Sequence, residues 1–144
     1  MNNSMEQLLD KHGYFVGPPH GYSMYPTLRD HKDTMHIVKK SKDLKKYDVV
    51  LFRRSSGQLV LHRLLKIKNG QLTICGDGQF KKEYSVKENQ VIGVMDSFCR
   101  GEKEIKCTSK LYRAYVKIWC FSLPTKRALM FFYKLGLRIG RVFR

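Results

Sequence analysis

Short runs of strand composition, separated by turn signals, constrain the fold of this chain most strongly. They occupy residues 34–39, 48–53, 58–67, 71–75 and 90–98, with glycine-containing turns between several of them. Asn69-Gly70 is the clearest hairpin signal, because both residues tolerate the left-handed backbone of a tight turn. No helical pattern separates these runs. The sequence therefore predicts a mainly β fold with a compact antiparallel β domain.

Helical patterns lie at both ends of the chain. Ser4 and Gln7 resemble a capping box and predict a short helix over about residues 4–12, ended by Gly13. From Lys110 the apolar period changes to about 3.6 residues, and Pro124 divides this region into two amphipathic helices. We therefore expect a β domain over residues 1–109 and a C-terminal pair of basic amphipathic helices over residues 110–144.

The positive charge is concentrated in the C-terminal segment. The chain has a net charge of +16, and residues 110–144 carry nine basic residues and no acidic one. Such an excess predicts attraction to a polyanion. Each Lys or Arg near an anionic bilayer contributes on the order of 1 kcal/mol, so we expect the helices to bind a membrane surface. The residues expected to do so are Lys117, Trp119, Arg127, Lys134, Arg138 and Arg141.

Two alternatives remain for this tail. The apolar helix faces can pack on the β domain while the basic faces are merely solvated. Nucleic-acid binding ranks third, because the chain has no helix-turn-helix, zinc-finger or aromatic RNA-binding signature.

The cysteines and the N-terminus bear on location and cofactors. The four cysteines form no Cys-x-x-Cys pair and have no histidine at zinc-finger spacing, so no metal or other cofactor is expected. Glu6, Asp10 and Lys11 interrupt the N-terminal region, which predicts no secretory signal and no membrane span. We therefore expect reduced thiols and peripheral attachment at the cytoplasmic side of a membrane.

Ser23 and His62 are the candidate catalytic pair. Ser23 lies in a loop stiffened by prolines on both sides, and a fixed approach angle lowers the entropic part of a reaction barrier. His62 interrupts an apolar strand, and a neutral imidazole is well suited to take a serine proton near neutrality. The alternatives are a turn serine bonded to its own backbone and a structural histidine.

Two carboxylates are candidates to orient His62. Asp77 lies between Gly76 and Gly78, where an ordinary Asp-Gly turn is the alternative explanation, and Glu83 follows six residues later.

Five segments, in order over about residues 14–98, resemble the conserved boxes of one superfamily. The chain is similar to type I signal peptidases and the related self-cleaving repressor peptidases. The segments are the nucleophile box Ser23-Met24-Tyr25-Pro26-Thr27-Leu28, the second box Tyr47–Phe52, the general-base box Val60-Leu61-His62-Arg63, Gly76-Asp77-Gly78-Gln79, which is similar to a Gly-Asp-Asn box, and the closing strand Ile92-Gly93-Val94. Histidine as the base is typical of the endoplasmic-reticulum-type branch.

The resemblance implies a β-rich fold whose cleft accepts an extended peptide as an added strand. It also implies cleavage after a small residue through an acyl-enzyme on Ser23, with the Ser23 N–H in the oxyanion hole. It implies a carboxylate behind His62, for which we rank Asp77 before Glu83. The residues expected to contact substrate are Tyr22, Met24, Pro26 and Leu61.

Four features depart from the family pattern. Gly21 stands where the family often has an oxyanion-supporting serine, and Tyr47 stands where a glycine is usual. No membrane anchor is expected among the 22 residues before Ser23, and the basic tail is additional.

Two functions follow. The leading hypothesis is a Ser/His endopeptidase, held at the cytoplasmic face of a membrane, that trims leaders from small ribosomally made peptides. The alternative is a catalytically inactive module that binds a peptide or an anionic surface.

Overall fold

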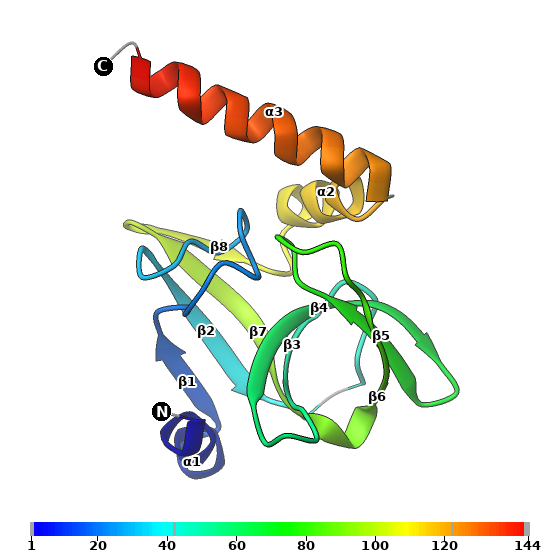
Figure 1. Ribbon diagram of the computed structural model, residues 1–144. Coiled ribbons are helices and arrows are strands. Elements are labelled where there is room, and N and C mark those ends of the chain that lie inside the picture. The colour runs from blue at the N-terminus through cyan, green and yellow to red at the C-terminus, as the bar shows by residue number, and fades with distance from the viewer. Residues whose placement is uncertain (1, 42, 122, 143–144) are drawn as a thin grey trace. The chain divides into compact units, whose positions relative to one another are not determined.

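The computed structural model describes residues 2–41, 43–121 and 123–142. These residues form two compact units, Met1–Ser109 and Lys110–Arg144, and each unit is described by itself. Figure 1 shows the strands in the first unit and the two long C-terminal helices in the second.

One antiparallel sheet dominates the described part of the first unit. Its strands follow the spatial order β1-β2-β7-β3-β4-β5-β6, and β8 pairs with β7. The strands are β1 (Tyr14–Gly17), β2 (Asp33–Lys39), β3 (Val49–Arg53), β4 (Leu59–Lys68), β5 (Gln71–Cys75), β6 (Glu83–Lys87), β7 (Val91–Arg100) and β8 (Lys103–Lys106), with the short 3-10 helix η1 (Glu88–Gln90) before β7. The sheet curls but does not close into a barrel (Figure 1).

The mainly β, antiparallel fold class is therefore confirmed. The five expected strand runs correspond to β2, β3, β4, β5 and β7. Asn69 and Gly70 form the turn between β4 and β5 with φ angles of 51° and 72°. The sequence did not predict β1, β6 and β8, which have only four or five residues each. Short edge strands carry little hydrophobic pattern of their own, because pairing with a longer neighbour holds them in place.

One hydrophobic core cluster of this unit joins several strands of the sheet. Its buried residues come mainly from β3, β4, β5, β6 and β7, and they are Leu44, Val50, Phe52, Leu64, Leu72, Ile74, Val86 and Val91. This packing fixes β3 and β4, the two strands that carry much of the site described below.

Helix α1 (Asn2–His12) packs against β1 and β2. Leu9 of this helix is buried, and Gly13, at φ 78°, ends the helix by donating its N–H to the Leu9 carbonyl at 2.9 Å. The end of the helix is as expected. The start is not, because the helix begins at Asn2, so Ser4 lies inside it and is not its N-cap.

The second unit consists of α2 (Lys110–Trp119) and α3 (Leu123–Val142), and the break falls beside Pro124 as expected. Among the described residues, no helix combines the length and the hydrophobicity needed to cross a bilayer. All four cysteines of the chain are free thiols.

The tail residues expected at a membrane differ in their exposure. Lys117, Arg127, Lys134 and Arg138 are exposed, whereas the side chain of Arg141 lies outside the part that the structure describes. Trp119, which was expected to contact a membrane, is only 5% exposed, so this structure does not present its ring at the surface. Its position explains this, because Tyr112, Val116 and Trp119 are spaced on one face of α2 and all three are buried.

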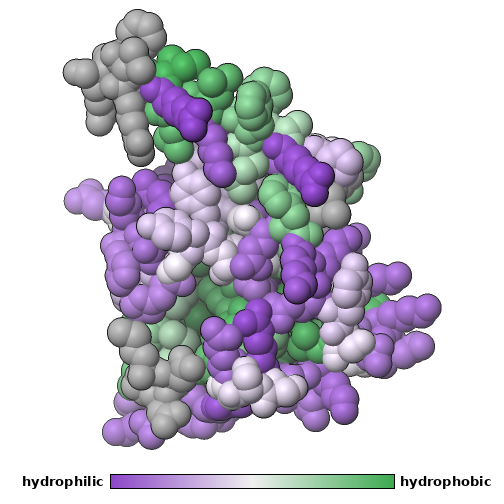
Figure 2. Space-filling model, viewed as in Figure 1, coloured by the Kyte–Doolittle hydropathy of each residue, from purple (hydrophilic) through white to green (hydrophobic). Residues whose placement is uncertain are grey.

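Other apolar side chains of the tail are exposed instead. They are Leu111, Ile118, Phe121, Phe131, Phe132, Leu135, Leu137 and Ile139. On α3 these apolar side chains lie at the surface beside basic ones, seen as green next to purple in Figure 2. The exposed face of the tail is therefore both apolar and basic.

Candidate active site

Ser23 lies in the loop between β1 and β2, and hydrogen bonds within the loop shape the backbone around it. The Tyr25 N–H donates to the Tyr22 carbonyl at 3.1 Å, and the Leu28 N–H donates to the Met24 carbonyl at 3.0 Å. The Tyr25–Pro26 peptide bond is cis. Met24 and Leu28 are buried, whereas Ser23 itself is partly exposed. The loop is thus anchored in the core while it leaves the serine accessible.

A second loop, Gly76-Asp77-Gly78, supports the Ser23 backbone from the other side. The Gly78 N–H donates to the Ser23 carbonyl at 2.8 Å. A Cβ added to Gly76 would lie 2.4 Å from that carbonyl oxygen, and one added to Gly78 would lie 2.6 Å from the Tyr22 oxygen. Both contacts are with backbone, so only glycine permits this approach.

We expect Gly76→Ala to displace the Ser23 loop. Misplacement of a nucleophile by about 1 Å can cost on the order of 100-fold in rate. Acylation of Ser23, measured as the rate of labelling by a serine-reactive probe, should therefore fall by roughly 10–100-fold. Gly136→Ala is the matched control, because a Cβ there meets nothing within 4 Å. Equal labelling rates for the two variants would contradict this role of Gly76.

Asp77 contacts Arg63 and Thr27 rather than His62. It thereby links three of the segments that resemble superfamily boxes. Its carboxylate accepts hydrogen bonds from Arg63 Nε at 2.7 Å and Arg63 Nη2 at 2.6 Å, and also from the Thr27 hydroxyl. Arg63 further donates to the Tyr47 carbonyl at 2.9 Å. Arg63 and Asp77 are 1% and 2% exposed. This buried pair therefore ties the Ser23 loop to β4.

Glu83 is the carboxylate that contacts the candidate base. His62, on β4, is 1% exposed, and its Nδ1 lies 3.0 Å from Glu83 Oε1. An ionised carboxylate only accepts hydrogen bonds, so Nδ1 carries the proton and Nε2 is left as the basic nitrogen. From the sequence we expected Asp77, ahead of Glu83, to be the carboxylate behind His62. The structure places Glu83 there instead.

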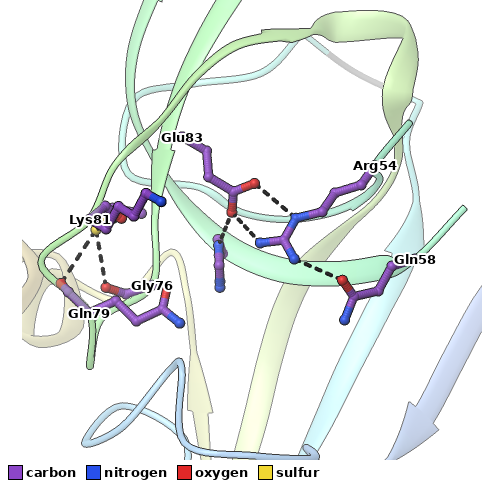
Figure 3. A network of polar contacts seen from close by, with 8 residues as sticks. Arg54, Gln58, Gly76, Gln79, Lys81 and Glu83 are labelled. Atoms are coloured by element: carbon purple, nitrogen blue, oxygen red, sulfur yellow. Dashed lines mark hydrogen bonds and ion pairs between the residues drawn. The ribbon is translucent and has the colours of Figure 1, made fainter. Parts of the chain in front are cut away.

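Arg54 holds Glu83 in place. Its Nε and Nη2 donate to the two oxygens of Glu83 at 2.9 and 2.7 Å, and its Nη1 donates to Gln58 Oε1 at 2.8 Å (Figure 3). A bidentate Arg–carboxylate contact fixes both position and orientation. The carboxylate that contacts His62 is therefore itself fixed in position by Arg54.

This surrounding sets the protonation states. Burial lowers the pKa of His62 below its usual 6.5, while the charge of Glu83 and its hydrogen bond act in the opposite direction. The hydrogen bond from Arg54 lowers the pKa of Glu83 despite its burial, and Glu83 in turn raises the pKa of Arg54. Near neutral pH the site therefore holds a neutral imidazole on an ionised glutamate.

The pH dependence of acylation follows from these shifts. The rate should rise with pH as His62 loses its proton and should reach its plateau at a lower pH than for an ordinary histidine, because burial lowers the pKa of His62 below 6.5. Glu83→Gln removes a group that raises this pKa, so the rising limb should move to lower pH and the plateau should fall. Glu88→Gln, which changes a carboxylate paired with Lys40, is the control and should keep the original profile. A limb that moves to higher pH in Glu83→Gln would contradict the assignment.

Ser23 and His62 line the same pocket, which has a volume of about 230 Å³. Within the described residues no hydrogen bond joins the Ser23 hydroxyl to His62, a common situation in catalytic sites without substrate. Of the expected substrate contacts, Met24 and Leu61 line the pocket. Tyr22, which is 72% exposed, and the buried Pro26 are not among its lining residues.

Several lining residues were not expected from the sequence. They are Pro19, His20, Gly21, Leu28, Met35, Arg54, Gln58, Leu59, Val60 and Gln79. Most of them carry no local signature, because the fold alone brings the β1–β2 loop, the β3–β4 hairpin and Gln79 together. The available signals were Leu28, Val60 and Gln79, which lie inside the segments that resemble the superfamily boxes, and Gly21, which lies two residues before Ser23.

The start of β4 offers an open edge beside this pocket. Leu59, Val60, Leu61 and His62 pair with β3, whereas the described pairing with β5 begins only at Arg63. In addition, the Ser23 N–H donates to no acceptor in the described part of the chain. A strand edge and a free N–H beside a nucleophile are the groups that an extended substrate would use.

The two residues that depart from the pattern of the resembled superfamily, Gly21 and Tyr47, lie at left-handed backbone positions. Gly21 has φ 84° and donates its N–H to Asp30 Oδ1 at 2.8 Å, a conformation in which serine would be strained. Tyr47 has φ 78°, where glycine would be unstrained, and its N–H donates to the Leu64 carbonyl at 2.7 Å. Neither position reaches the Ser23 hydroxyl with a polar side chain of its own.

No protein-family model matches this chain, and no curated protein matches it at a significant level.

Proposed function

We propose that the chain is a serine endopeptidase in which Ser23 is the nucleophile, His62 the general base and Glu83 the carboxylate that orients the base. The observation that carries the proposal is that Ser23 and His62 line one pocket while Glu83 contacts Nδ1 of His62 and leaves Nε2 as the basic nitrogen. Nucleophile, base and orienting group are the three parts that nucleophilic acyl transfer requires.

The proposed reaction uses these groups in turn. Ser23 Oγ attacks the peptide carbonyl while His62 Nε2 takes its proton, and the Ser23 N–H stabilises the oxyanion. Glu83 stabilises the imidazolium that forms. The tetrahedral intermediate then expels the amine, which takes the proton from His62, and Ser23 is left as an ester. Water, activated by the same imidazole, hydrolyses this ester and restores the serine.

The shape of the site supports an extended peptide as substrate. Residues 59–61 have a free edge with which a peptide strand can pair, and they line the pocket themselves. Met24, Leu28 and Met35 give the pocket an apolar wall. Its modest volume favours a small residue before the scissile bond. We therefore propose extended peptides with a small residue before the scissile bond as substrates, and we carry forward leaders of small ribosomally made peptides as the substrate class to be tested.

Cleavage by the purified protein tests this proposal. Short peptides that bear leaders should be cut once, after a small residue, and Ser23→Ala should abolish the cut. Cleavage of ordinary secretory precursors with no cleavage of leader peptides would overturn the substrate class. Cleavage that persists in Ser23→Ala would overturn the mechanism.

A second candidate function is an inactive peptide-binding module. The absence of a Ser23–His62 hydrogen bond in the described structure favours it, as does the lack of a hydroxyl at Gly21. Both candidates use the same open strand edge, so peptide binding alone does not separate them. Covalent reaction of Ser23 does.

For the tail we propose attachment to an anionic membrane surface. Lys117, Arg127, Lys134 and Arg138 are exposed among exposed apolar side chains, the composition of an interfacial helix.

Neutralising two of these charges should weaken the attachment. Because each basic residue contributes about 1 kcal/mol, the double change Lys134→Gln and Arg138→Gln should lower vesicle binding by about 30-fold. Sedimentation with vesicles that contain phosphatidylserine measures this. Lys66→Gln with Lys68→Gln, which changes two exposed lysines of β4, is the matched control. Equal effects of the two double changes, or no sedimentation of the parent protein at moderate salt, would contradict the proposal.

A further inference from the structure

Two histidines and an aspartate gather on the Ser23 loop, outside the catalytic constellation. His20, Asp30 and His31 each offer one ligand atom, and these three atoms lie within 4.8 Å of one another. The two imidazole rings meet edge to face with their centroids 4.8 Å apart. His31 Nε2 lies 3.6 Å from Asp30 Oδ1. The three side chains therefore converge although His20 and Asp30 are ten positions apart in the sequence.

Backbone contacts bring the two ends of this segment together. The His31 N–H donates to the Pro19 carbonyl at 3.2 Å, and the Gly21 N–H donates to Asp30 Oδ1 at 2.8 Å. His31 has φ 52°, a left-handed conformation uncommon for a residue with a side chain. These contacts fix the backbone of the cluster. Rotation of the side chains is then enough to bring the three ligand atoms to one metal ion.

The ligand set selects a class of metal. Two imidazoles and one carboxylate form the three-ligand set of zinc sites that keep one position open. Bonds of about 2.0–2.2 Å place the ligand atoms of a tetrahedral site about 3.3–3.6 Å apart. The cluster is slightly wider than this, and its histidines are exposed and free to adjust. Ca²⁺ and Mg²⁺ are disfavoured, since they require mainly oxygen ligands.

We propose that His20, Asp30 and His31 form a binding site for a divalent transition metal of the zinc class. The metal links the two ends of the segment that carries Ser23. His20 and Gly21 also line the pocket that Ser23 and His62 share, so the bound metal stiffens one wall of that pocket. The site is independent of the proposed peptidase activity, because its ligands are not the catalytic groups.

Metal titration of the full-length protein tests the site. Isothermal titration with Zn²⁺ should give one site per chain, and Co²⁺ should produce the visible absorption of a tetrahedral complex. His20→Ala and His31→Ala should each weaken binding by at least tenfold. His36→Ala is the matched control, because His36 is also a histidine beside an aspartate, with its Nδ1 3.8 Å from Asp96, and it should bind metal like the parent.

A loss of metal binding must be distinguished from a loss of folding. Circular dichroism and thermal unfolding show whether the variants are folded, and the milder His31→Gln replaces His31→Ala if that variant is not. All variants keep the four free cysteines and the other histidines, so binding that is unchanged in His20→Ala and His31→Ala would place the metal on groups outside this cluster and overturn the proposal. Absence of Zn²⁺ binding up to millimolar concentration would overturn it as well.

Discussion

Replacing His62 with glutamine is expected to slow the acylation of Ser23 by roughly 10²–10⁴-fold, the usual contribution of a general base. The physical reason is that the change removes Nε2, the ring nitrogen of His62 that stays unprotonated and basic when Nδ1 donates to Glu83. Glutamine suits the test better than alanine, because His62 is 1% exposed and packs near Phe52, with ring centroids 6.2 Å apart. The measurement is the rate of labelling by a serine-reactive probe at pH 7.5.

Two controls separate chemistry from folding in this experiment. His12→Gln changes an exposed histidine and should label like the parent protein. Thermal unfolding should show that His62→Gln remains folded at the assay temperature. A folded His62→Gln protein that labels at the parental rate would remove His62 from the mechanism.

The largest effect on stability is expected for Asp77→Ala. This change leaves the guanidinium of Arg63 buried without its bidentate carboxylate, which typically costs about 3–5 kcal/mol. It also removes the acceptor of the Thr27 hydroxyl, and with it a link between the Ser23 loop and β4. Urea unfolding measures the change in the free energy of unfolding.

Two control variants accompany Asp77→Ala: one removes an exposed aspartate, and the other removes both buried charges. Asp96, whose side chain is 54% exposed beside His36, forms a surface pair, and Asp96→Ala should cost no more than about 1 kcal/mol. Changing both partners, with Arg63→Met and Asp77→Leu, should restore most of the lost stability, because no unpaired charge then remains buried. A loss of less than about 1 kcal/mol in Asp77→Ala would show that the pair does not hold the two segments together.

The sequence predicted the framework of the β unit well, because its signals are local. Alternation and turn residues identify β2, β3, β4, β5 and β7, and Asn69-Gly70 identifies a hairpin. The pairing of Ser23 with His62 was a geometric expectation, and the structure places both residues on one pocket. Their roles in catalysis remain a proposal.

The orienting carboxylate was harder to predict, because it depends on the faces of a strand. His62 and Arg63 are consecutive on β4, so their side chains point to opposite faces of the sheet. Asp77 binds Arg63, and Glu83 binds His62. The number of residues between His62 and each carboxylate does not show which carboxylate contacts His62 and which contacts Arg63. The role of Arg54 was missed for a similar reason, since its contact with Glu83 joins residues 29 positions apart.

The most direct test of the central claim is the intact mass of the protein after reaction with a fluorophosphonate, which phosphonylates activated serines. The account predicts a single adduct, located on Ser23 by peptide mapping, absent in Ser23→Ala and strongly slowed in His62→Gln. An unmodified parent protein, or an adduct on another residue that persists in Ser23→Ala, would contradict the assignment of Ser23 as an activated nucleophile.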